Sequence, residues 1–361
     1  MKAIEEFEKL LQESIDDGAF PGANYCIVTK KRSYFGSLGN RALFPEIEKN
    51  DIDTVYDMAS LSKVVSTTSL ILKLVEAGRL RLHTAVQTFI PEFRHQEVTV
   101  WDLLTHSSGL PADVSRAKEI ASKEELMEKI FAMDLVYPRN SQIVYSDIGY
   151  ILLGKIIEKI TGVPLDRYAK EILFTPLEMF DTTYNPGDKK RCAPTEERKD
   201  RIVQGILRGE VHDEKSYILG GVAGHAGLFS TVTDVAHFID MILNKGVYKG
   251  RRIFSEAVID LLFAPKVEIS HPLIKNYDRR GIGWIIQSCY SSAGDLVSEE
   301  TILHTGFTGT NIWIDRRNEI GFCLLTNRVH PTRENLKIIT VRPKLANFIM
   351  AHLDEFKKED L

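Results

Sequence analysis

The sequence DMASLSK, residues Asp57 to Lys63, joins a short apolar strand predicted for residues 54–58 to a long helix predicted from Ser60 to about Ala77. Ser60 and Lys63 are three positions apart, and this spacing on a helix places two side chains on one face, with Cβ atoms about 5–6 Å apart. Ser60 would lie in the first turn, where free backbone N–H groups and the helix dipole can stabilise an oxyanion. Lys63, if burial removes its proton, could accept the proton of Ser60. The pattern predicts the chemistry of S-x-x-K hydrolases.

The same spacing occurs a second time in the chain, at Ser115 and Lys118, so the motif alone has low specificity. The second copy lies among charged residues, and we expect Ser115 in a loop or at a helix cap. The first copy is followed by apolar residues on nearly every helical face, which is typical of a helix that crosses a core. A lysine at the head of such a helix has to be paired or has a shifted pKa. This favours the functional interpretation over a capping serine with a surface lysine.

Length and composition are ordinary for a globular protein. The chain has 361 residues, enough for two domains or for one large domain with an insertion, and it is 43% apolar and 27% charged. Its net charge of −4 arises from 46 basic and 50 acidic residues. This balance gives no electrostatic reason to expect nucleic acid or an anionic membrane as a partner.

The lack of a recognisable signal sequence and the spacing of the cysteines both lead us to expect a reducing compartment. The first residues, MKAIEEF, are charged without an apolar signal core, and no apolar run approaches the length of a membrane span. The four cysteines are far apart and show no C-x-x-C spacing, at Cys26, Cys192, Cys289 and Cys323. We expect buried free thiols and a cytoplasmic protein.

Strand-like runs stand near both ends of the chain, at residues 23–29, 33–39, 281–287, 301–305, 311–315 and 320–326. The segment between them is rich in helices and loops. We therefore expect an α+β fold, in which one antiparallel sheet, flanked by helices, takes its strands from both ends of the chain. The predicted sheet domain comprises residues 1–77 and 226–361, and the mainly helical insertion domain comprises residues 78–225.

Helical periodicity places further elements within this frame. Apolar spacing predicts an N-terminal helix that stops at Gly18, a helix that a capping box opens at Ser122, a helix that stops at Gly162, and a final helix around Leu345. A charged run at residues 196–201 is interpreted as a solvated excursion.

A second motif that could carry chemistry is Tyr145-Ser146-Asp147, between an extended run and the helix that begins near Asp147. Tyr145 could share a proton with Lys63 and pass it to a leaving group, provided that a nearby cation lowers the pKa of the phenol. The structural alternative is an aromatic ring that packs on the helix, with Ser146 or Asp147 as the N-cap.

A third motif is HTGFTG, residues 304–309, which ends one strand and leads into another. Its glycines would let a substrate approach the backbone closely, and a strand N–H group there could supply the second half of an oxyanion hole. The alternative is a glycine-rich connection without a chemical role.

The three motifs in this order resemble the serine β-lactamase and penicillin-binding protein superfamily. The likeness is strongest to the branch of class C β-lactamases, D,D-peptidases and family VIII esterases, and it extends to residues 103–111, 145–154 and 306–315. The resemblance implies a β-lactamase/transpeptidase-like fold, an α/β sandwich with an all-helical domain and the site between them. It also implies that no metal and no organic cofactor is needed, and that the partner is a small-molecule or short-peptide substrate.

The resemblance further implies a role for each motif residue. Ser60 would be the nucleophile, Lys63 its general-base partner and Tyr145 the shared acid and base. The N–H groups of Ser60 and Phe307 would form the oxyanion hole.

Two residues depart from the β-lactamase pattern. Asp147 stands where that pattern has asparagine, and a carboxylate cannot donate a hydrogen bond unless it is protonated. It could instead pair with Lys63 or receive a substrate N–H or ammonium group. His304 replaces lysine beside Thr305 and Gly306, and histidine reads carboxylates more weakly and with a pH dependence. Both changes argue against a dedicated β-lactamase. Asp147, His304, Thr305 and Gly306 are all expected to contact the substrate.

The segments VHDE (211–214) and GGVAGHAG (220–227) resemble a subset of the superfamily that includes D,D-carboxypeptidases and muropeptide amidases. His225 could contact substrate, or the loop could be structural with hydrogen-bonded histidines. A mononuclear metal site formed by His212, Asp213 and His225 is the least favoured interpretation.

Our interpretation is a serine hydrolase that acts through an acyl-enzyme on an ester or amide, with a peptidoglycan-derived peptide or a small ester as substrate. The alternatives are a β-lactamase, and a binding or sensing module that acylates without turnover or merely holds a peptide. The presence of all the acid and base groups favours the hydrolase.

Overall fold

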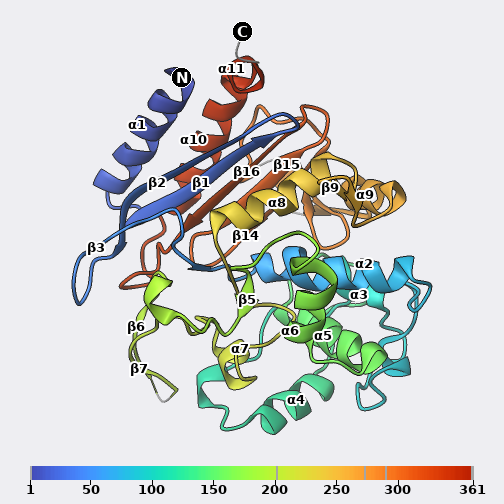
Figure 1. Ribbon diagram of the computed structural model, residues 1–361. Coiled ribbons are helices and arrows are strands. Elements are labelled where there is room, and N and C mark those ends of the chain that lie inside the picture. Colours follow the sequence, from blue (N-terminus) through green and yellow to red (C-terminus); the bar gives the residue numbers. More distant parts are fainter. Residues whose placement is uncertain (1, 201, 272–273, 289–290, 359–361) are drawn as a thin grey trace.

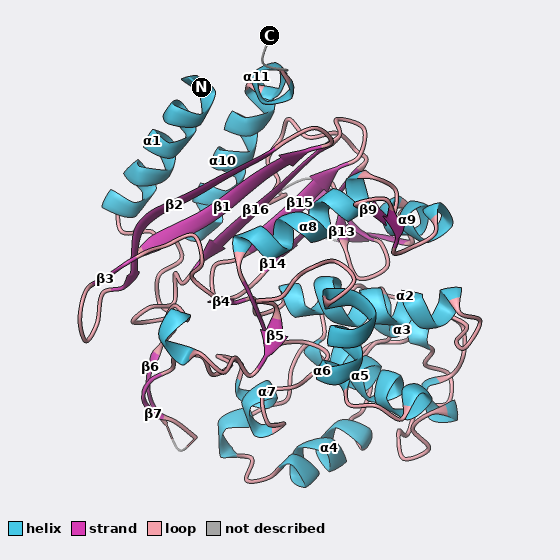
Figure 2. Ribbon diagram, in the orientation of Figure 1, coloured by secondary structure: helices cyan, strands magenta, loops and turns pink. Residues whose placement is uncertain are grey.

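The computed structural model describes residues 2–200, 202–271, 274–288 and 291–358, whose arrangement is shown in Figure 1. A large sheet lies between helices on both of its faces, and a mainly helical region lies beside it (Figure 2). The helices at the two ends of the chain lie next to each other on the outer face of the sheet. The α+β class expected from the sequence is confirmed.

The large sheet has nine strands in the order β11-β12-β13-β14-β15-β16-β1-β2-β3, and the neighbouring strands are antiparallel. Strands from the two ends of the chain pair inside the sheet, where Cys26 of β1 lies opposite Cys323 of β16. The strands are Gly22–Thr29 (β1), Ser33–Ala42 (β2), Glu48–Lys49 (β3), Val267–His271 (β11), Ile274–Arg280 (β12), Ile285–Ile286 (β13), Thr301–Thr305 (β14), Asn311–Asp315 (β15) and Ile320–Thr326 (β16). The sequence analysis missed β11 and β12 and overestimated the length of β13.

Each face of the sheet carries its own helical layer (Figure 1). Phe7 and Leu11 of α1 are fully buried with Leu345 and Ile349 of α10 in the core of the outer face. On the other face, α8 contacts β1 and β16, and α9 contacts β14. The helices of these layers are α1 (Lys2–Asp16), α10 (Ile338–Ala351), α11 (Leu353–Lys357), α8 (Val232–Leu243) and α9 (Glu256–Phe263).

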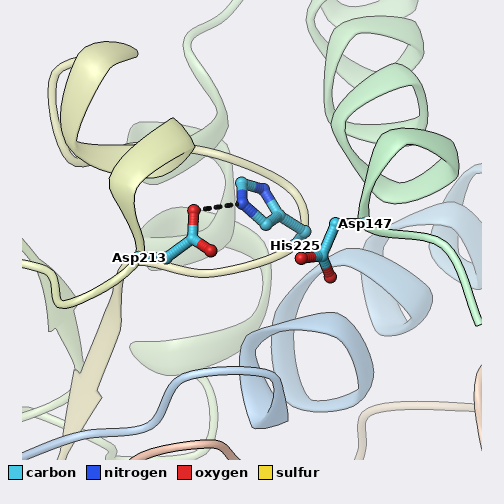
Figure 3. A group of neighbouring side chains, drawn as sticks. All are labelled: Asp147, Asp213 and His225. Atoms are coloured by element: carbon cyan, nitrogen blue, oxygen red, sulfur yellow. Dashed lines mark hydrogen bonds and ion pairs between the residues drawn. The ribbon is translucent and has the colours of Figure 1, made fainter. Parts of the chain in front are cut away.

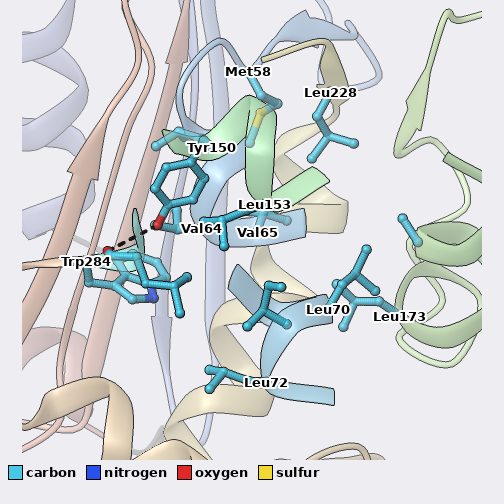
Figure 4. Close-up of a cluster of buried hydrophobic side chains, with 14 of the residues drawn as sticks. Met58, Val64, Val65, Leu70, Leu72, Tyr150, Leu153, Leu173, Leu228 and Trp284 are labelled. Carbon is cyan, nitrogen blue, oxygen red and sulfur yellow. Dashed lines mark hydrogen bonds between the residues drawn. The ribbon is translucent and has the colours of Figure 1, made fainter. Parts of the chain in front are cut away.

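The helical region packs on the sheet through a continuous apolar core. Figure 4 shows Met58, Val64, Leu153, Leu228 and Trp284 among the buried side chains of this core. The helices of the region are α2 (Ser69–Glu76), α3 (Val100–Leu104), α4 (Lys123–Phe131), α5 (Asp147–Thr161), α6 (Leu165–Ala169) and α7 (Glu214–Ile218). A three-stranded sheet links the region to the rest, formed by β4 (Tyr56–Asp57), β8 (Leu228–Ser230) and β5 (Thr183–Tyr184). The remaining strands are β6 (Glu197–Lys199), β7 (Gln204–Ile206), β9 (Val247–Tyr248) and β10 (Arg251–Arg252).

The helix predicted to start at Ser60 is not a regular α-helix. Ser60 lies in a turn, the wide π-helical segment Lys63–Thr68 follows, and only then does α2 begin. A hydrogen bond fastens this segment to a distant loop, since Thr67 Oγ1 donates to the Gly224 carbonyl at 2.7 Å. Such π-turns are uncommon and occur frequently at functional sites. The apolar pattern did not reveal this change, because the anchoring contacts are polar and long-range.

The charged run at residues 196–201, predicted to be a solvated excursion, is solvated only in part. Glu197 and Lys199 are exposed while Glu196 and Arg198 are buried, and residue 201 lies outside the described residues. Glu196 is 8% exposed and Arg198 only 2% exposed. The Glu196 carboxylate accepts hydrogen bonds from Arg333, with its Oε1 2.8 Å from the Arg333 Nε, and lies 3.0 Å from the His212 ring. These charges are paired across a buried seam, and a run of charged letters does not distinguish pairing from solvation.

Several smaller predictions can also be compared with the structure. Cys26, Cys192 and Cys323 are buried free thiols as expected, whereas Cys289 lies outside the described residues. Ser115 lies in an exposed turn, as expected for the second copy of the motif. Within the described ranges, no helix has the length and apolarity needed to cross a bilayer. The division of the chain into two domains and the cytoplasmic location both stay predictions.

Candidate active site

Ser60 lies in a tight turn that directly follows β4. The preceding residue, Ala59, has a φ of 46°, a left-handed conformation that non-glycine residues rarely adopt. The buried carboxylate of Asp57 holds the turn, since it accepts the Ala59 N–H at 2.8 Å and the His212 N–H at 2.7 Å. Ser60 is therefore presented by a strained backbone that is fastened to a strand.

The Lys63 side chain is fully buried, and its ammonium group has three oxygen partners. Its Nζ donates to Ser60 Oγ at 2.9 Å and to the His225 carbonyl at 3.0 Å. The third partner is Asp147, whose Oδ1 lies 2.8 Å away. Burial by itself lowers the pKa of Lys63, but the Asp147 carboxylate and the Tyr145 phenol outweigh it and raise this pKa above its usual value. The carboxylate beside the ammonium thus opposes the effect of burial, and the role of Lys63 as the base of Ser60 stays a prediction.

Tyr145 covers this ammonium group. The Lys63 Nζ lies 4.9 Å from the centre of the Tyr145 ring. The ring also lies next to two histidines, with centroid distances of 4.7 Å to His106 and 5.9 Å to His304. His106 has a structural role, since its Nδ1 accepts the Ser146 N–H at 3.0 Å. Tyr145 therefore lies between the helical segment that carries Lys63 and the strand β14 that carries His304.

Asp147 lies between two lysines. In addition to its contact with Lys63, its Oδ2 lies 3.3 Å from the Nζ of Lys215. Burial raises the pKa of the Asp147 carboxyl, but the charges of Lys63, His225 and Lys215 more than offset this and lower it. Ser146 supplies the N-cap of α5, so the carboxylate is free to pair with the lysines. Of the roles considered for Asp147, the structure contains the pairing with Lys63.

Lys215 connects this carboxylate to a second acidic group. Its buried Nζ lies 3.0 Å from Asp213 Oδ2 and 2.9 Å from Asp113 Oδ1. Asp213 in turn accepts a hydrogen bond from His225 Nε2 at 2.7 Å, as Figure 3 shows. Burial raises the pKa of Asp213, but His225 and Lys215 together bring it well below its usual value. A chain of alternating charges therefore runs from Lys63 to the surface.

The three residues of the metal site that the sequence analysis least favoured, His212, Asp213 and His225, do not form one cluster of ligand atoms in the described structure. His212 pairs with Glu196 instead, with 3.0 Å between its Nε2 and Oε2 of the carboxylate. Asp147, Asp213 and His225 do offer ligand atoms within 4.8 Å of one another (Figure 3). However, the ammonium group of Lys215 contacts both of these carboxylates, and a divalent cation would meet its repulsion. Charge pairing accounts for this cluster better than metal binding does.

The third motif lies against the turn that contains Ser60. Thr308 Oγ1 donates to the Asp57 carbonyl at 2.8 Å, and Thr310 Oγ1 donates to the Met58 carbonyl at 3.0 Å. Gly306 is required at this close approach, because a Cβ on it would lie 2.0 Å from Thr310 Oγ1 and 2.7 Å from the Met58 carbonyl oxygen. These contacts hold the segment that follows β14 against the turn that contains Ser60.

His304 is buried and cannot read a carboxylate as lysine would. Its Nδ1 lies 2.9 Å from the Thr305 carbonyl, so this nitrogen carries the hydrogen and Nε2 is an acceptor. Burial, Lys63 and Arg280 lower the pKa of His304 to about 3. The sequence analysis expected His304 to bind a carboxylate in a pH-dependent way. The lowered pKa favours a neutral imidazole instead, which carries no charge to attract a carboxylate. Among the described residues, Nε2 has no hydrogen-bond partner.

Two cavities meet at Ser60, with volumes of about 450 Å³ and about 220 Å³. Ser60, Tyr145 and Phe307 line both of them. The larger cavity also contains His304, Thr305 and Gly306, and the smaller one contains Asp147 and His225. Every candidate site residue from the sequence other than the fully buried Lys63 thus lines one of the cavities, and Lys63 contacts Ser60 directly.

The sequence analysis missed several charged residues of the site. Arg280, Arg328 and Arg342 line the larger cavity, and Lys215 lines the smaller one. Only Lys215 had a signal, since it directly follows the segment VHDE. Within the described part of the chain, the backbone N–H groups of Ser60 and Phe307 donate no hydrogen bond. Both amides are therefore available to a ligand in the cavities that they line.

Comparisons with known proteins agree with this geometry. A model of the beta-lactamase family matches residues 7–345. An N-acetylmuramyl-L-alanine amidase of Bacillus subtilis (strain 168) is 34% identical, over 91% of this chain and 82% of its own length. A protein of Escherichia coli (strain K12) named as a D-alanyl-D-alanine carboxypeptidase is 30% identical, over 91% of this chain and 83% of its own.

Solved structures share the fold at low sequence identity. A penicillin-binding protein homologue from Caulobacter crescentus is 18% identical, with a TM-score of 0.78 over 97% of this chain and 98% of its own. EstCE1, a hydrolase with promiscuous acyltransferase activity, is also 18% identical, with a TM-score of 0.77 over 96% of this chain and 98% of its own. The likeness therefore extends over nearly the whole chain.

Proposed function

Because the chain belongs to the beta-lactamase family, a group of serine hydrolases acting on amides and esters, we propose that it cleaves an amide or ester bond in a peptidoglycan-derived peptide, with Ser60 as the nucleophile. The observation that carries this proposal is the 2.9 Å contact between Lys63 and Ser60 in a cavity that Tyr145 and Phe307 also line. The substrate class follows the relatives named amidase and carboxypeptidase. No cofactor enters the proposed reaction.

Acylation begins with removal of the Ser60 proton. The proposed acceptor is the hydroxyl of Tyr145, which lies beside Lys63 and passes a proton onward in the same step. The Lys63 Nζ lies 4.9 Å and the Arg280 guanidinium 6.0 Å from the centre of the Tyr145 ring. Ser60 Oγ then bonds to the substrate carbonyl carbon, and the phenol returns the proton to the leaving amine or alcohol.

The tetrahedral intermediate places a negative charge on the former carbonyl oxygen. The N–H groups of Ser60 and Phe307 are the proposed donors to this oxygen. Water then attacks the acyl-enzyme, with Tyr145 taking its proton and giving it to Ser60 Oγ. The cycle thus returns Ser60 and Tyr145 to their starting forms.

The two cavities suggest how a substrate lies across Ser60. The larger cavity has an apolar rim, and the smaller one has Asp147, Asp213 and Lys215 in its wall. A peptide with polar N–H groups on one side of the scissile bond and a less polar group on the other fits this pair. The His225 carbonyl accepts a hydrogen bond from Lys63, and His225 also lines the smaller, polar cavity. The apolar rim consists of Ile285, Phe307, Leu336, Ile338 and Ile339.

A carboxypeptidase reaction is a second candidate, because one cation in the larger cavity has spare donors. Arg280 pairs only with Asp278 at 3.2 Å, and its Nη1 has no hydrogen-bond partner among the described residues. A substrate carboxylate could bind there, whereas the neutral His304 does not attract one.

A panel of three substrates tests the proposal. The kcat/KM values of a muropeptide, a short-chain nitrophenyl ester and a chromogenic cephalosporin are compared for the wild type and Ser60→Ala. We expect the cephalosporin to be the poorest substrate and Ser60→Ala to lose all three activities. A muropeptide with a free C-terminal D-alanine carboxylate, compared with its C-terminal amide, separates the carboxypeptidase from the amidase reaction. A clear preference for the cephalosporin would refute the proposed substrate class, and activity that survives in Ser60→Ala would refute the nucleophile.

A further inference from the structure

The peptide unit between Gly306 and Phe307 is held from its carbonyl side. This unit is trans, so its C=O and N–H groups point in opposite directions. The N–H belongs to Phe307 and is the proposed oxyanion donor, and the C=O belongs to Gly306. Whatever binds the Gly306 carbonyl therefore acts on the opposite end of the dipole that would meet the oxyanion. The inference below rests on the proposed function of this amide.

Arg342 of α10 binds that carbonyl. Its Nη2 donates to the Gly306 oxygen at 2.9 Å and to the Thr310 oxygen at 2.8 Å. These two residues close the loop of the third motif, since the Gly306 N–H donates to the same Thr310 oxygen at 2.8 Å. A helix from the end of the chain therefore determines the orientation of the loop beside Ser60.

Arg328 binds the carbonyl of Phe307 itself, in the next peptide unit. Its Nε donates to the Phe307 oxygen at 2.8 Å, and its guanidinium carbon lies 4.5 Å from the centre of the Phe307 ring. The Nη1 of Arg328 is also anchored, since it donates to the carbonyls of Arg333 and Asn335 at 2.8 Å and 2.7 Å. Two guanidinium groups thus bind the peptide units on either side of the Phe307 Cα. Arg342 binds the Gly306 carbonyl, and Arg328 binds the Phe307 carbonyl.

The burial of Arg342 calls for an explanation. Its side chain is in a residue only 8% exposed, and no carboxylate of the described residues forms an ion pair with it. An unpaired buried charge costs free energy, and such charges are normally paired in structural roles. Here the positive charge is directed at backbone carbonyls that border Ser60.

We propose that Arg342 is a positioning residue of the hydrolase, which orients and polarises the Phe307 N–H by binding the carbonyl oxygen of Gly306. A hydrogen bond from a cation to a carbonyl withdraws electron density along the amide and makes its N–H a stronger donor. The effect is largest in the transition state, when a full negative charge forms on the substrate oxygen. Arg328 serves the same amide by fixing the next peptide unit.

A direct contact between Arg342 and an anionic substrate is the competing role, because Arg342 also lines the larger cavity. The test therefore uses a neutral nitrophenyl ester, which has no carboxylate to read, alongside an anionic analogue of the same acyl group. The variants are Arg342→Gln and Arg342→Lys. Lys344→Gln is the matched control, since Lys344 lies on the same helix with 52% of its side chain exposed.

With the neutral ester, we expect Arg342→Gln to lower kcat by about tenfold to a hundredfold, because removal of a whole oxyanion donor costs about 10²–10³ in kcat. KM should change little, and Arg342→Lys should recover part of the loss because it restores a cationic donor. Lys344→Gln should match the wild type. The affinity for a boronic acid that mimics the tetrahedral intermediate should fall in parallel with kcat.

A double-mutant cycle identifies the group through which Arg342 acts. Phe307→Pro removes the ring and the N–H, whereas Phe307→Ala removes the ring and keeps the N–H. The effect of Arg342→Gln should persist in the Phe307→Ala background and largely disappear in the Phe307→Pro background.

Three results would overturn the inference. They are a folded Arg342→Gln with the kcat of the wild type, a loss confined to the anionic ester, and an undiminished loss in the Phe307→Pro background. If Arg342→Gln does not fold by circular dichroism, Arg342→Lys decides by the same readouts. Failure of the proposed function itself is distinguishable, because it would leave the ester turnover intact in Ser60→Ala.

Discussion

The carboxylate of Asp147 lies 2.8 Å from the buried ammonium of Lys63, and this pair sets the charge of the site. The contact holds the pKa of Lys63 above its usual value despite complete burial. The Asp147 carboxylate therefore favours the charged form of Lys63 beside Ser60.

Replacing Asp147 by asparagine should move the alkaline limb of the pH–rate profile to lower pH. The carboxylate raises the pKa of Lys63, so its loss lets Lys63 deprotonate at lower pH. The measurement is kcat/KM against pH with the neutral ester. Asp113→Asn is the control, since Asp113 contacts Lys215 but is not a partner of Lys63. An alkaline limb that stays in place would show that Asp147 does not govern the charge of Lys63.

Replacing His304 by lysine should improve acylation by a cephalosporin. The imidazole of His304 is neutral, with a pKa of about 3, whereas an ammonium group would pair with the β-lactam carboxylate. A charge-assisted hydrogen bond contributes about 1.5–3 kcal/mol, so an increase of about tenfold or more in kcat/KM is expected. His304→Gln provides a neutral control. Equal rates for the lysine and glutamine variants would argue against this explanation of substrate preference.

Gly306→Ala should be strongly harmful, since the new methyl group would lie 2.0 Å from Thr310 Oγ1 and 2.7 Å from the Met58 carbonyl oxygen. Overpacking of this kind costs about 1–3 kcal/mol, and the displaced loop would also carry Phe307 away from Ser60. Both the free energy of unfolding and kcat should fall. Gly187→Ala is the control, because a Cβ there meets no atom within 4 Å. Similar behaviour of the two variants would contradict the close packing of the third motif on the nucleophile turn.

Glu196→Gln should remove part of the pH dependence of stability. Burial raises the pKa of Glu196, but hydrogen bonds from His212 and Arg333 dominate and lower it. A carboxyl group with a depressed pKa stabilises the fold above its unfolded pKa, near pH 4.5, and this contribution is lost as the pH falls towards its folded pKa. The Tm of Glu196→Gln should therefore lie below that of the wild type at pH 7, with a difference that shrinks on acidification. Glu334→Gln, an exposed neighbour, should show no such trend, and a constant Tm difference at all pH values would exclude the linkage.

Much of this architecture could be predicted from the chain alone. The strands at both ends, the helix that stops at Gly162 and the cap at Ser122 follow local patterns of period, cap and turn. The proximity of Ser60, Tyr145 and Phe307 could be predicted only because their motifs occur in an order that resembles a known superfamily.

The charges that surround the site could not be predicted, for a physical reason. Lys215 and Arg342 belong to no motif, and each acts through contacts with residues distant in the sequence. The protonation of Lys63 likewise depends on Asp147, and the two residues are in contact only in the folded chain. Local periodicity reports which side chains are buried, but it does not report which charges meet.

The most direct test of the account is intact-mass spectrometry of the protein after rapid mixing with a slowly deacylating ester, followed by peptide mapping. We expect one acyl group per chain on the peptide that contains Ser60, a decay of this adduct at the rate of turnover, and no adduct in Ser60→Ala. An adduct on another residue, or turnover by Ser60→Ala at the rate of the wild type, would contradict the central claim.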